Sequence, residues 1–246
     1  MAVLSIRTAN DVTIFPQRIN QNDTMDLSSL FPANVVILHA TDEMWETPVR
    51  TEEERLIQDS VAKRQRQFRA GRNAAHAALE QLDAPDGPLL RGENRQPIWP
   101  QGYVGSISHC DDSCVAVCAP EGEIVSLGID VEPLKPLKPK IARYIDTEDE
   151  KAFMQRHRDL PRRLIFSAKE SLYKCYYPLV GRFFGFQSVT LDIDISRQRF
   201  QFRPTAACRI DFPQHLQFHG GYQIAEEHLY TGCFLTPGTP VAVPGR

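Results

Sequence analysis

The spacing of apolar and polar residues in the first part of the chain predicts a strand, a helical segment and a hairpin. Four consecutive apolar residues at 35–38 predict a buried strand. Apolar residues at helical spacing between Leu56 and Leu82 predict one or two helices. Two alternating segments, 104–108 and 114–118, flank a polar connection and therefore predict a β-hairpin.

The rest of the chain repeats this order of strands and helices. The β-branched run 124–132 predicts a buried strand, and a proline- and lysine-rich loop follows it. Thr147 and Glu150 form a capping box, which predicts the start of a helix, and Pro178 is expected to stop the next one. The predicted helices are 147–156 and 162–177, and the predicted strands are 189–195, 199–203, 208–212 and 228–235.

This recurrence predicts a mixed fold of the α/β (α+β) class with two similar halves. Residues 119–123 lie between the two occurrences, so we divide the chain into an N-terminal half, 1–120, and a C-terminal half, 121–246. The halves share no evident sequence identity, so the predicted repeat is one of architecture. A length of 246 residues accommodates two such halves or one large domain.

Composition and charge narrow the class of protein. Hydrophobic residues make up 42% of the chain and charged residues 24%, which excludes a disordered or collagen-like chain. The net charge of −3 supplies no global positive field, so neither nucleic acid nor an anionic membrane is the expected partner. Neither a leader nor a membrane-spanning run stands out, and six cysteines are too sparse for a disulfide framework. We therefore expect a soluble, cytoplasmic protein.

Three evenly spaced cysteines, Cys110, Cys114 and Cys118, raise the alternative of a metal site. Structural zinc usually takes closely spaced pairs of cysteines, and that pattern is absent here. Free cysteine is commonly buried as a small hydrophobic residue. We favour burial for these three residues.

Two carboxylates lie together at the end of the predicted strand 124–132. Asp130 and Glu132 are two residues apart, and the period of two in a strand puts both on one face. Their oxygens suit Mg²⁺ or Ca²⁺. A charged strand end facing water is the plainer alternative, but a buried strand would deliver the pair to a sheet edge, where ligands of α/β proteins gather.

A third carboxylate lies on the predicted helix 162–177. Glu170 and Lys174 are four residues apart, so they share one helix face. Such a pair is usually a solvated surface ion pair. A carboxylate combined with lysine is, however, also what a metal-bound polyphosphate site requires.

Five cations within residues 63–72 form a basic segment in a chain of negative net charge. Arg64, Phe68 and Arg72 share one helical stripe, and guanidinium groups on such a stripe can bind phosphate in a forked geometry. A solvated basic surface is the alternative. Further candidates for contacts with phosphate oxygens are Arg91, Arg95, Ser108 and His109.

Three motifs stand in one order along the chain: GSISH at 105–109, GIDVE at 128–132 and FSAKESLYK at 166–174. In this order and spacing they resemble the 4'-phosphopantetheinyl transferase superfamily, and the last motif is the most specific. The basic segment and the stretch 97–100 resemble the subgroup typified by the enterobactin synthase D component. The resemblance spans about residues 55–180.

The resemblance implies an activity and an architecture. Members transfer 4'-phosphopantetheine from coenzyme A to a serine of an acyl, aryl or peptidyl carrier protein, use Mg²⁺ and release 3',5'-ADP. The monomeric type has two similar α/β halves related by a pseudo-twofold axis, with coenzyme A in the cleft between them. We expect the same of this chain.

The resemblance also implies a role for each candidate residue. Asp130, Glu132 and Glu170 would ligate Mg²⁺, and Glu170, directly or through a metal-bound water, would take the proton from the carrier serine. Lys174, together with Lys169, would neutralise the pyrophosphate. The implied catalytic set is Glu170, Lys174 and Asp130, and the implied coenzyme A-binding set is Arg64, Arg72, Ser108, His109, Asp130, Lys169, Glu170, Lys174 and one or both of Arg91 and Arg95.

One departure and two alternatives accompany this interpretation. Val131, the middle residue of the Asp-x-Glu motif, is apolar, so water or Glu170 must complete the metal shell. A metal-dependent nuclease or phosphodiesterase would share the carboxylates but would need a basic surface track, which the net charge disfavours. A catalytically silent carrier-binding protein would have lost the carboxylates. The sequence leaves open which carrier is the substrate, and whether fatty acid, polyketide, peptide and siderophore pathways are all served.

Overall fold

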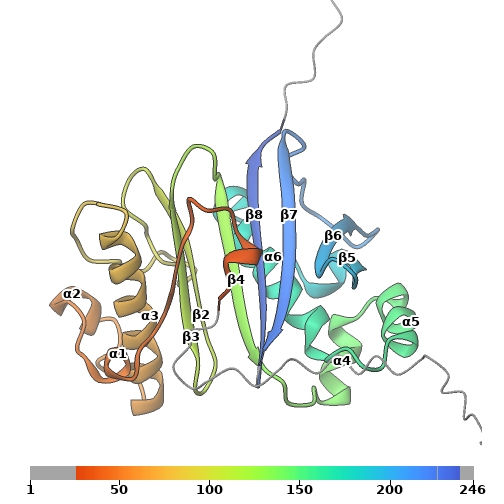
Figure 1. Cartoon of the computed structure of the whole chain (residues 1–246), viewed down its shortest axis with the longest axis horizontal. Helices are drawn as coiled ribbons and strands as arrows, with labels where there is room; N and C mark the ends of the chain where they lie inside the picture. Colours follow the sequence, from red (N-terminus) through yellow and green to blue (C-terminus); the bar gives the residue numbers. More distant parts are fainter. Residues whose placement is uncertain (1–25, 226, 239–246) are drawn as a thin grey trace, which may run out of the picture.

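The computed structural model of the chain describes residues 26–225 and 227–238, and two antiparallel sheets stand side by side in it (Figure 1). The N-terminal half carries three strands in the order β1-β3-β2, and the alanine-rich face of α3 packs against them. The elements of this half are η1 (Ser28–Leu30), β1 (Val36–His39), α1 (Asp42–Glu46), α2 (Thr51–Glu54), α3 (Ala62–Glu80), β2 (Tyr103–His109) and β3 (Cys114–Pro120).

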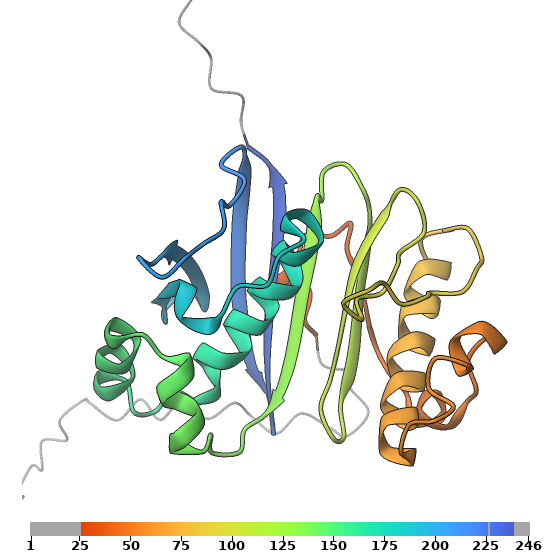
Figure 2. The ribbon, with the colours of Figure 1, turned by 180° about the vertical axis from the view of Figure 1, so that it is seen from behind.

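The C-terminal half carries five strands in the order β4-β8-β7-β6-β5, and α6 crosses one face of this sheet (Figure 2). Its elements are β4 (Ser126–Pro133), α4 (Pro139–Ile145), α5 (Glu148–Arg156), α6 (Arg163–Val180), η2 (Phe186–Ser188), β5 (Val189–Asp194), β6 (Arg199–Pro204), β7 (Leu216–Ala225) and β8 (His228–Pro237). The predicted mixed class with two helix-and-sheet halves is confirmed. The division at residues 120 and 121 stays a prediction.

Local sequence signals placed several elements correctly. β2 and β3 form the predicted hairpin, with His109 opposite Cys114. The capping box is present, because the Glu150 carboxylate accepts the Thr147 N–H at 2.7 Å and Thr147 Oγ1 accepts the Glu150 N–H at 3.4 Å. Cys114 and Cys118 are buried in the N-terminal half, as expected for small hydrophobic residues, and Cys110 is half-buried.

Other predicted boundaries are wrong. Helix α6 runs through Pro178 to Val180 and ends at Gly181, which adopts the left-handed conformation at φ 61°. A proline so close to the end of a helix removes only one late hydrogen bond. The predicted strand 208–212 is a loop, and α4 begins inside the predicted loop, with Pro139 at its first position, where proline is favoured.

β7 was not predicted, because Gly220 and Gly221 interrupt its apolar pattern. A Cβ atom at Gly220 would lie 2.7 Å from the Phe200 ring and backbone, so the glycine lets β6 and its aromatic side chain approach β7 closely. Tyr176, Phe202 and Phe212 pack nearby, with ring centroids 4.7 to 5.4 Å apart. The core of this half is therefore largely aromatic.

The two sheets meet through side chains at their edges. β2 and β4 are edge strands that face each other. The hydroxyl of Ser106 accepts the Ile129 N–H at 3.1 Å, and that of Ser108 accepts the Val131 N–H at 3.2 Å. Two serine hydroxyls thus take the place of a strand ladder between the halves.

A glycine sets the distance between β4 and α6. A Cβ atom at Gly128 would lie 2.0 Å from the carbonyl oxygen of Ser171, so only glycine fits at this position. The close approach brings Asp130 on β4 within reach of Lys174, one turn along α6 from Ser171.

Candidate active site

Three polar side chains meet at the joint between the two halves, where Ser108 on β2, Asp130 on β4 and Lys174 on α6 lie together. Lys174 Nζ donates to Asp130 Oδ1 at 2.8 Å, to Ser108 Oγ at 2.9 Å and to the Ile129 carbonyl at 3.0 Å. The Ser108 hydroxyl also donates to Asp130 Oδ1 at 2.9 Å. Predicted site residues from β2, β4 and α6 are therefore assembled around the buried Asp130.

The other two candidate carboxylates share the electrostatic field of Asp130. Burial, followed by the charge of Asp130, raises the pKa of Glu132, while Arg163 and Lys174 oppose the shift. Burial, followed by the charge of Asp130, also raises the pKa of Glu170. Negative charge is thus concentrated at this joint, which raises the cost of ionising these groups.

The donor set fits a divalent cation. Asp130 Oδ2 is buried and has no hydrogen-bond partner, so it is an anionic oxygen open to a ligand. Glu132 is ion-paired with Arg163, a half-buried residue at the start of α6 that sequence reasoning missed. A cation would have to compete with Arg163 and Lys174 for carboxylate oxygens, and it would relieve the repulsion between the three acids.

A group other than these three acids has the close spacing of a metal site in the described part of the chain. Its three possible ligand atoms all lie within 4.8 Å of one another. It consists of Cys110, Asp112 and His228. Asp112 Oδ1 lies 3.3 Å from Cys110 Sγ and 3.0 Å from His228 Nε2, so hydrogen bonds account for the spacing. The three acids of the joint are therefore spread more widely than this group.

The N-terminal half contributes a cluster of cations beside the joint. Arg64 Nη1 lies 2.8 Å from His109 Nε2. Burial, followed by the charges of Arg91 and Arg95, lowers the pKa of Arg64. Both candidate loop arginines therefore lie close enough to act on Arg64.

Arg72 is the buried member of this cluster. Its guanidinium carbon lies 4.7 Å from the ring centroid of Phe68, and the side chain is 6% exposed. Burial lowers its pKa to about 10; Glu53 opposes the shift, and Arg64 and Arg91 add to it. Because these like charges repel, an anion such as phosphate would stabilise the cluster.

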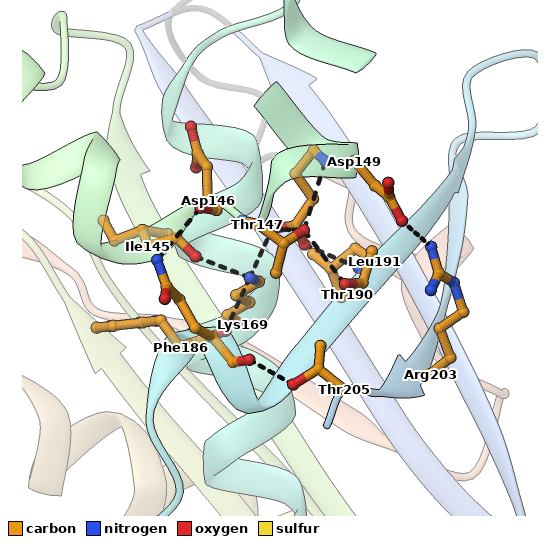
Figure 3. Close-up of polar contacts among 12 residues, drawn as sticks. Ile145, Asp146, Thr147, Asp149, Lys169, Phe186, Thr190, Leu191, Arg203 and Thr205 are labelled. Carbon is orange, nitrogen blue, oxygen red and sulfur yellow. Dashed lines mark hydrogen bonds and ion pairs between the residues drawn. The ribbon is translucent and has the colours of Figure 1, made fainter. Parts of the chain in front are cut away.

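The ammonium of Lys169 does not join the cluster around Asp130, contrary to the sequence-based expectation. Its ammonium donates to the Ile145 carbonyl at 2.9 Å, the Glu150 carboxylate at 2.7 Å and the Phe186 carbonyl at 2.8 Å (Figure 3). With Lys169 at 2% exposure and all three N–H donors used, nothing remains for a pyrophosphate. Neighbouring residues on a helix point about 100° apart, so Lys169 and Glu170 face different surroundings.

A small, mainly apolar pocket lies beside Glu170. Its volume is about 180 Å³. The lining combines α6 with the segment that follows it. The lining residues are Lys169, Glu170, Tyr173, Phe183, Phe184, Gly185, Phe186 and Val189.

Comparison with known families divides the chain in the same way as its sheets. Residues 52–119 match the 4'-phosphopantetheinyl transferase N-terminal domain, and residues 126–228 match the 4'-phosphopantetheinyl transferase superfamily. The chain belongs to this superfamily. The similarity inferred from the motifs is confirmed, and it extends beyond residue 180.

Three curated relatives are similar to this chain, and two of them are named as 4'-phosphopantetheinyl transferases. The 4'-phosphopantetheinyl transferase PptT of Mycobacterium tuberculosis is 37% identical over 180 residues, which cover 68% of this chain and 78% of PptT. The 4'-phosphopantetheinyl transferase Svp of Streptomyces mobaraensis is 36% identical over 176 residues, covering 68% and 72%. Enterobactin synthase component D of Salmonella typhimurium is 37% identical over 125 residues, covering 49% and 51%. The chain is a 4'-phosphopantetheinyl transferase.

The matched regions of the transferase contain the whole cluster at the joint. The first region holds the arginines of α3 and the hairpin with Ser108, and the second holds Asp130, Glu170 and Lys174. Within the described residues, none of the helices is both long enough and apolar enough to cross a membrane.

His109 of the transferase gives a prediction for stability. Burial, followed by the charges of Arg64 and Lys174, lowers its pKa to about 4. An unfolded histidine has a pKa of about 6.5. As the pH falls from this value towards 4, the unfolded state therefore gains a proton that the folded state does not, and stability decreases. We expect His109→Asn to lose less free energy of unfolding than the wild type between about pH 7 and pH 4.5, measured by urea denaturation. The exposed His215→Asn should behave like the wild type, and an equal loss in both variants would contradict the prediction.

Proposed function

We propose that this transferase moves 4'-phosphopantetheine from coenzyme A to a serine hydroxyl of an apo acyl, aryl or peptidyl carrier protein and releases 3',5'-ADP. One observation carries the proposal: a cluster of cationic side chains and a cluster of acidic side chains meet at one joint. The charges of Arg64 from the first cluster and Asp130 from the second both act on the pKa of His109, whose Nε2 lies 2.8 Å from Arg64 Nη1. A pyrophosphate needs the cations, and a serine nucleophile needs a base.

The residues of the joint can support the two bond changes of this reaction and the transfer of the serine proton. The serine oxygen forms a bond to the phosphorus that carries the pantetheine, and the bond from that phosphorus to the oxygen of 3',5'-ADP breaks. Glu170 takes the serine proton, and its raised pKa makes it a stronger base than an ordinary carboxylate. Lys174, held by Asp130 and Ser108, neutralises charge on the phosphate oxygens.

Asp130, Glu132 and Glu170 are the residues that would hold Mg²⁺. When bound, the ion would polarise phosphoryl oxygens and neutralise their charge. The buried, unpartnered Oδ2 of Asp130 supports this assignment. Val131 is fully buried and its side chain is apolar, so this side chain offers the ion no ligand.

The pocket beside Glu170 suits the pantetheine arm of coenzyme A. Half of its lining residues are aromatic, including Tyr173, Phe184 and Phe186. An arm in this pocket would lie next to the proposed base, with its phosphate directed towards Lys174. The apolar wall would also exclude water, which would otherwise compete with the serine.

The arginine cluster gives a prediction for coenzyme A binding. We expect Arg64→Ala and Arg72→Ala to weaken coenzyme A more than 3'-dephospho-coenzyme A, because the lost guanidinium would bind the 3'-phosphate. Each charge-assisted contact should contribute about 1.5 to 3 kcal/mol, measurable by calorimetry. Arg66→Ala is the control, because Arg66 is an exposed arginine on the same helix, α3, and is paired with Glu46 of α1. Equal losses for both nucleotides would place the cluster outside the 3'-phosphate site.

The function is tested with the purified full chain, coenzyme A, Mg²⁺ and an apo acyl carrier protein. Intact-mass spectrometry should show the carrier heavier by one phosphopantetheine. A carrier that binds without gaining mass would indicate the silent carrier-binding alternative, and cleavage of a phosphodiester without transfer would indicate the nuclease. A panel of apo carriers from fatty acid, polyketide, peptide and siderophore pathways would then identify the substrate. The cytoplasmic location and the monomeric state stay predictions.

A further inference from the structure

A fully buried glutamate stands behind the arginine cluster of the N-terminal half. Glu53 is the third residue of α2 and is 0% exposed. Its carboxylate accepts the Arg50 N–H at 3.1 Å and the Leu89 N–H at 2.9 Å. His76 Nε2 lies 2.9 Å from it and Arg72 Nε 3.8 Å, both from α3.

A second buried glutamate occupies the same place in the C-terminal half. Glu150 is the third residue of α5 and is 1% exposed. Its carboxylate accepts the Thr147 N–H at 2.7 Å, the Lys169 ammonium at 2.7 Å and the Leu191 N–H at 2.8 Å (Figure 3). Lys169 lies on α6, the helix that packs on the sheet of this half.

The two networks correspond step by step. Each glutamate lies at the third position of a short helix and accepts the N–H of the residue that precedes that helix. Each contacts a basic side chain of the long helix that packs on its sheet, α3 or α6. Each also accepts the N–H of a residue in a later segment, Leu89 or Leu191. The same arrangement therefore recurs in both halves although their sequences differ.

We propose that Glu53 and Glu150 are equivalent positioning residues, Glu53 for the arginines that bind the phosphates of coenzyme A and Glu150, acting through Lys169, for Glu170. The proposal rests on the proposed function, because it assigns each glutamate to one side of that site. It adds residues that lie behind the reacting groups and touch neither coenzyme A nor the carrier.

On the N-terminal side, Glu53 connects the two segments that carry the cations. It supplies the nearest negative charge to the buried guanidinium of Arg72. It also holds Leu89, two residues before Arg91. Without this carboxylate the two arginines would lose their common anchor, and Arg72 would be buried without a counter-charge.

On the C-terminal side, Glu150 fixes α6 just before the proposed base. It is the anionic partner of Lys169, whose other two N–H donors hold the Ile145 and Phe186 carbonyls. Phe186 and Glu170 both line the small pocket. Loss of the Glu150 charge would remove the ion-pair partner of a buried ammonium and would release the part of α6 from which Glu170 projects.

The experiment compares two amide variants of the full chain, one expected to change the binding of coenzyme A and the other expected to change kcat. Glu53→Gln should raise the dissociation constant of coenzyme A about tenfold, with a smaller effect on 3'-dephospho-coenzyme A and little change in kcat at saturating coenzyme A. Glu150→Gln should lower kcat about tenfold or more and change the dissociation constant of coenzyme A less than about twofold. The exposed Glu52→Gln and Glu148→Gln, one and two residues away on the same helices, are the matched controls and should show neither effect.

The outcomes separate this proposal from the proposed function. If Arg72→Ala discriminates between the two nucleotides but Glu53→Gln does not, positioning by Glu53 is wrong while the phosphate site stands. If Arg72→Ala does not discriminate, the phosphate site itself is wrong. Two results would mean that the glutamates only stabilise the fold. The first is the same change in kcat and in the dissociation constant of coenzyme A for both amide variants. The second is no change in either quantity per folded molecule.

Two further variants keep the test decisive if an amide variant fails to fold. Glu53→Asp retains the charge and shortens the side chain by one methylene, so it should show the same loss of nucleotide discrimination to a smaller extent. The pair Glu150→Gln with Lys169→Met removes both charges of this buried ion pair together, so neither partner is left without the other and the variant should fold. It should still lower kcat, because the link from α6 to η2 is lost; a wild-type kcat would overturn the role of Glu150.

Discussion

Glu170→Gln is expected to lower the rate of phosphopantetheine transfer by about 10²- to 10⁴-fold while coenzyme A still binds. The amide keeps the shape of the side chain and one carbonyl oxygen, but it cannot accept the serine proton at neutral pH. Weaker metal binding should add to the loss, because the amide is a poorer ligand than a carboxylate. Single-turnover transfer to an apo carrier, with coenzyme A binding measured separately, checks the result.

A titration with Mg²⁺ or Mn²⁺ divides this loss between its two causes. A defect in metal affinity disappears at saturating metal, whereas a defect in proton acceptance persists. Full recovery of the rate would make Glu170 a ligand only. The base would then have to be a metal-bound hydroxide or a neighbour such as His109.

The same variant should make the metal-free protein more stable. Burial and the charge of Asp130 raise the pKa of Glu170, so its carboxylate destabilises the fold once the pH exceeds its ordinary titration range. We expect Glu170→Gln to increase the free energy of unfolding at pH 7 and to show no such gain below about pH 4, where the carboxyl group is protonated in both states. A loss of stability at pH 7 would indicate that Glu170 is mainly structural.

The second large effect is expected for Asp130→Ala, which should reduce transfer by roughly 10²-fold or more, since a bound metal contributes several kcal/mol of charge stabilisation. Asp130 is both a candidate metal ligand and the partner that holds Lys174 at the joint. Lys174 keeps the Ser108 hydroxyl and the Ile129 carbonyl as acceptors, so the variant should still fold.

Asp111→Ala provides the control for this variant. Asp111 is an exposed aspartate of the adjoining hairpin turn and is paired with Lys63 on the surface. Its loss should leave transfer unchanged. Near-normal turnover in Asp130→Ala, with Mg²⁺ as the metal and a normal thermal unfolding curve, would remove Asp130 from the active site.

Local patterns were sufficient to predict the elements whose cause is local. The capping box at Thr147 and Glu150 predicted the start of α5, and alternation predicted the hairpin that carries Ser108. The period of two placed Asp130 and Glu132 at the end of one strand, where both lie. The order and spacing of the three motifs, at 105–109, 128–132 and 166–174, are sufficient to indicate the family.

Long-range packing decided what the sequence could not indicate. Glu53 lies in a run of three glutamates, and nothing local shows that this one is buried against α3. Lys169 and Glu170 are neighbours and both line the small pocket, yet the position of α5 directs the Lys169 ammonium into a buried network with Glu150. Arg163 contacts Glu132 across the packing of α6 against β4, a long-range contact that no local pattern in the sequence indicates.

The two serine hydroxyls between β2 and β4 have a consequence for how the chain can be divided. Each strand is the outer strand of its sheet, and an uncovered outer strand offers unpaired N–H and C=O groups to other molecules. Ser106 and Ser108 occupy two of the N–H groups of β4, and the neighbouring half shields the rest of that edge. Either half produced alone would expose a strand edge, so cutting the chain between β3 and β4 should yield fragments that aggregate separately and remain soluble only when they are produced together.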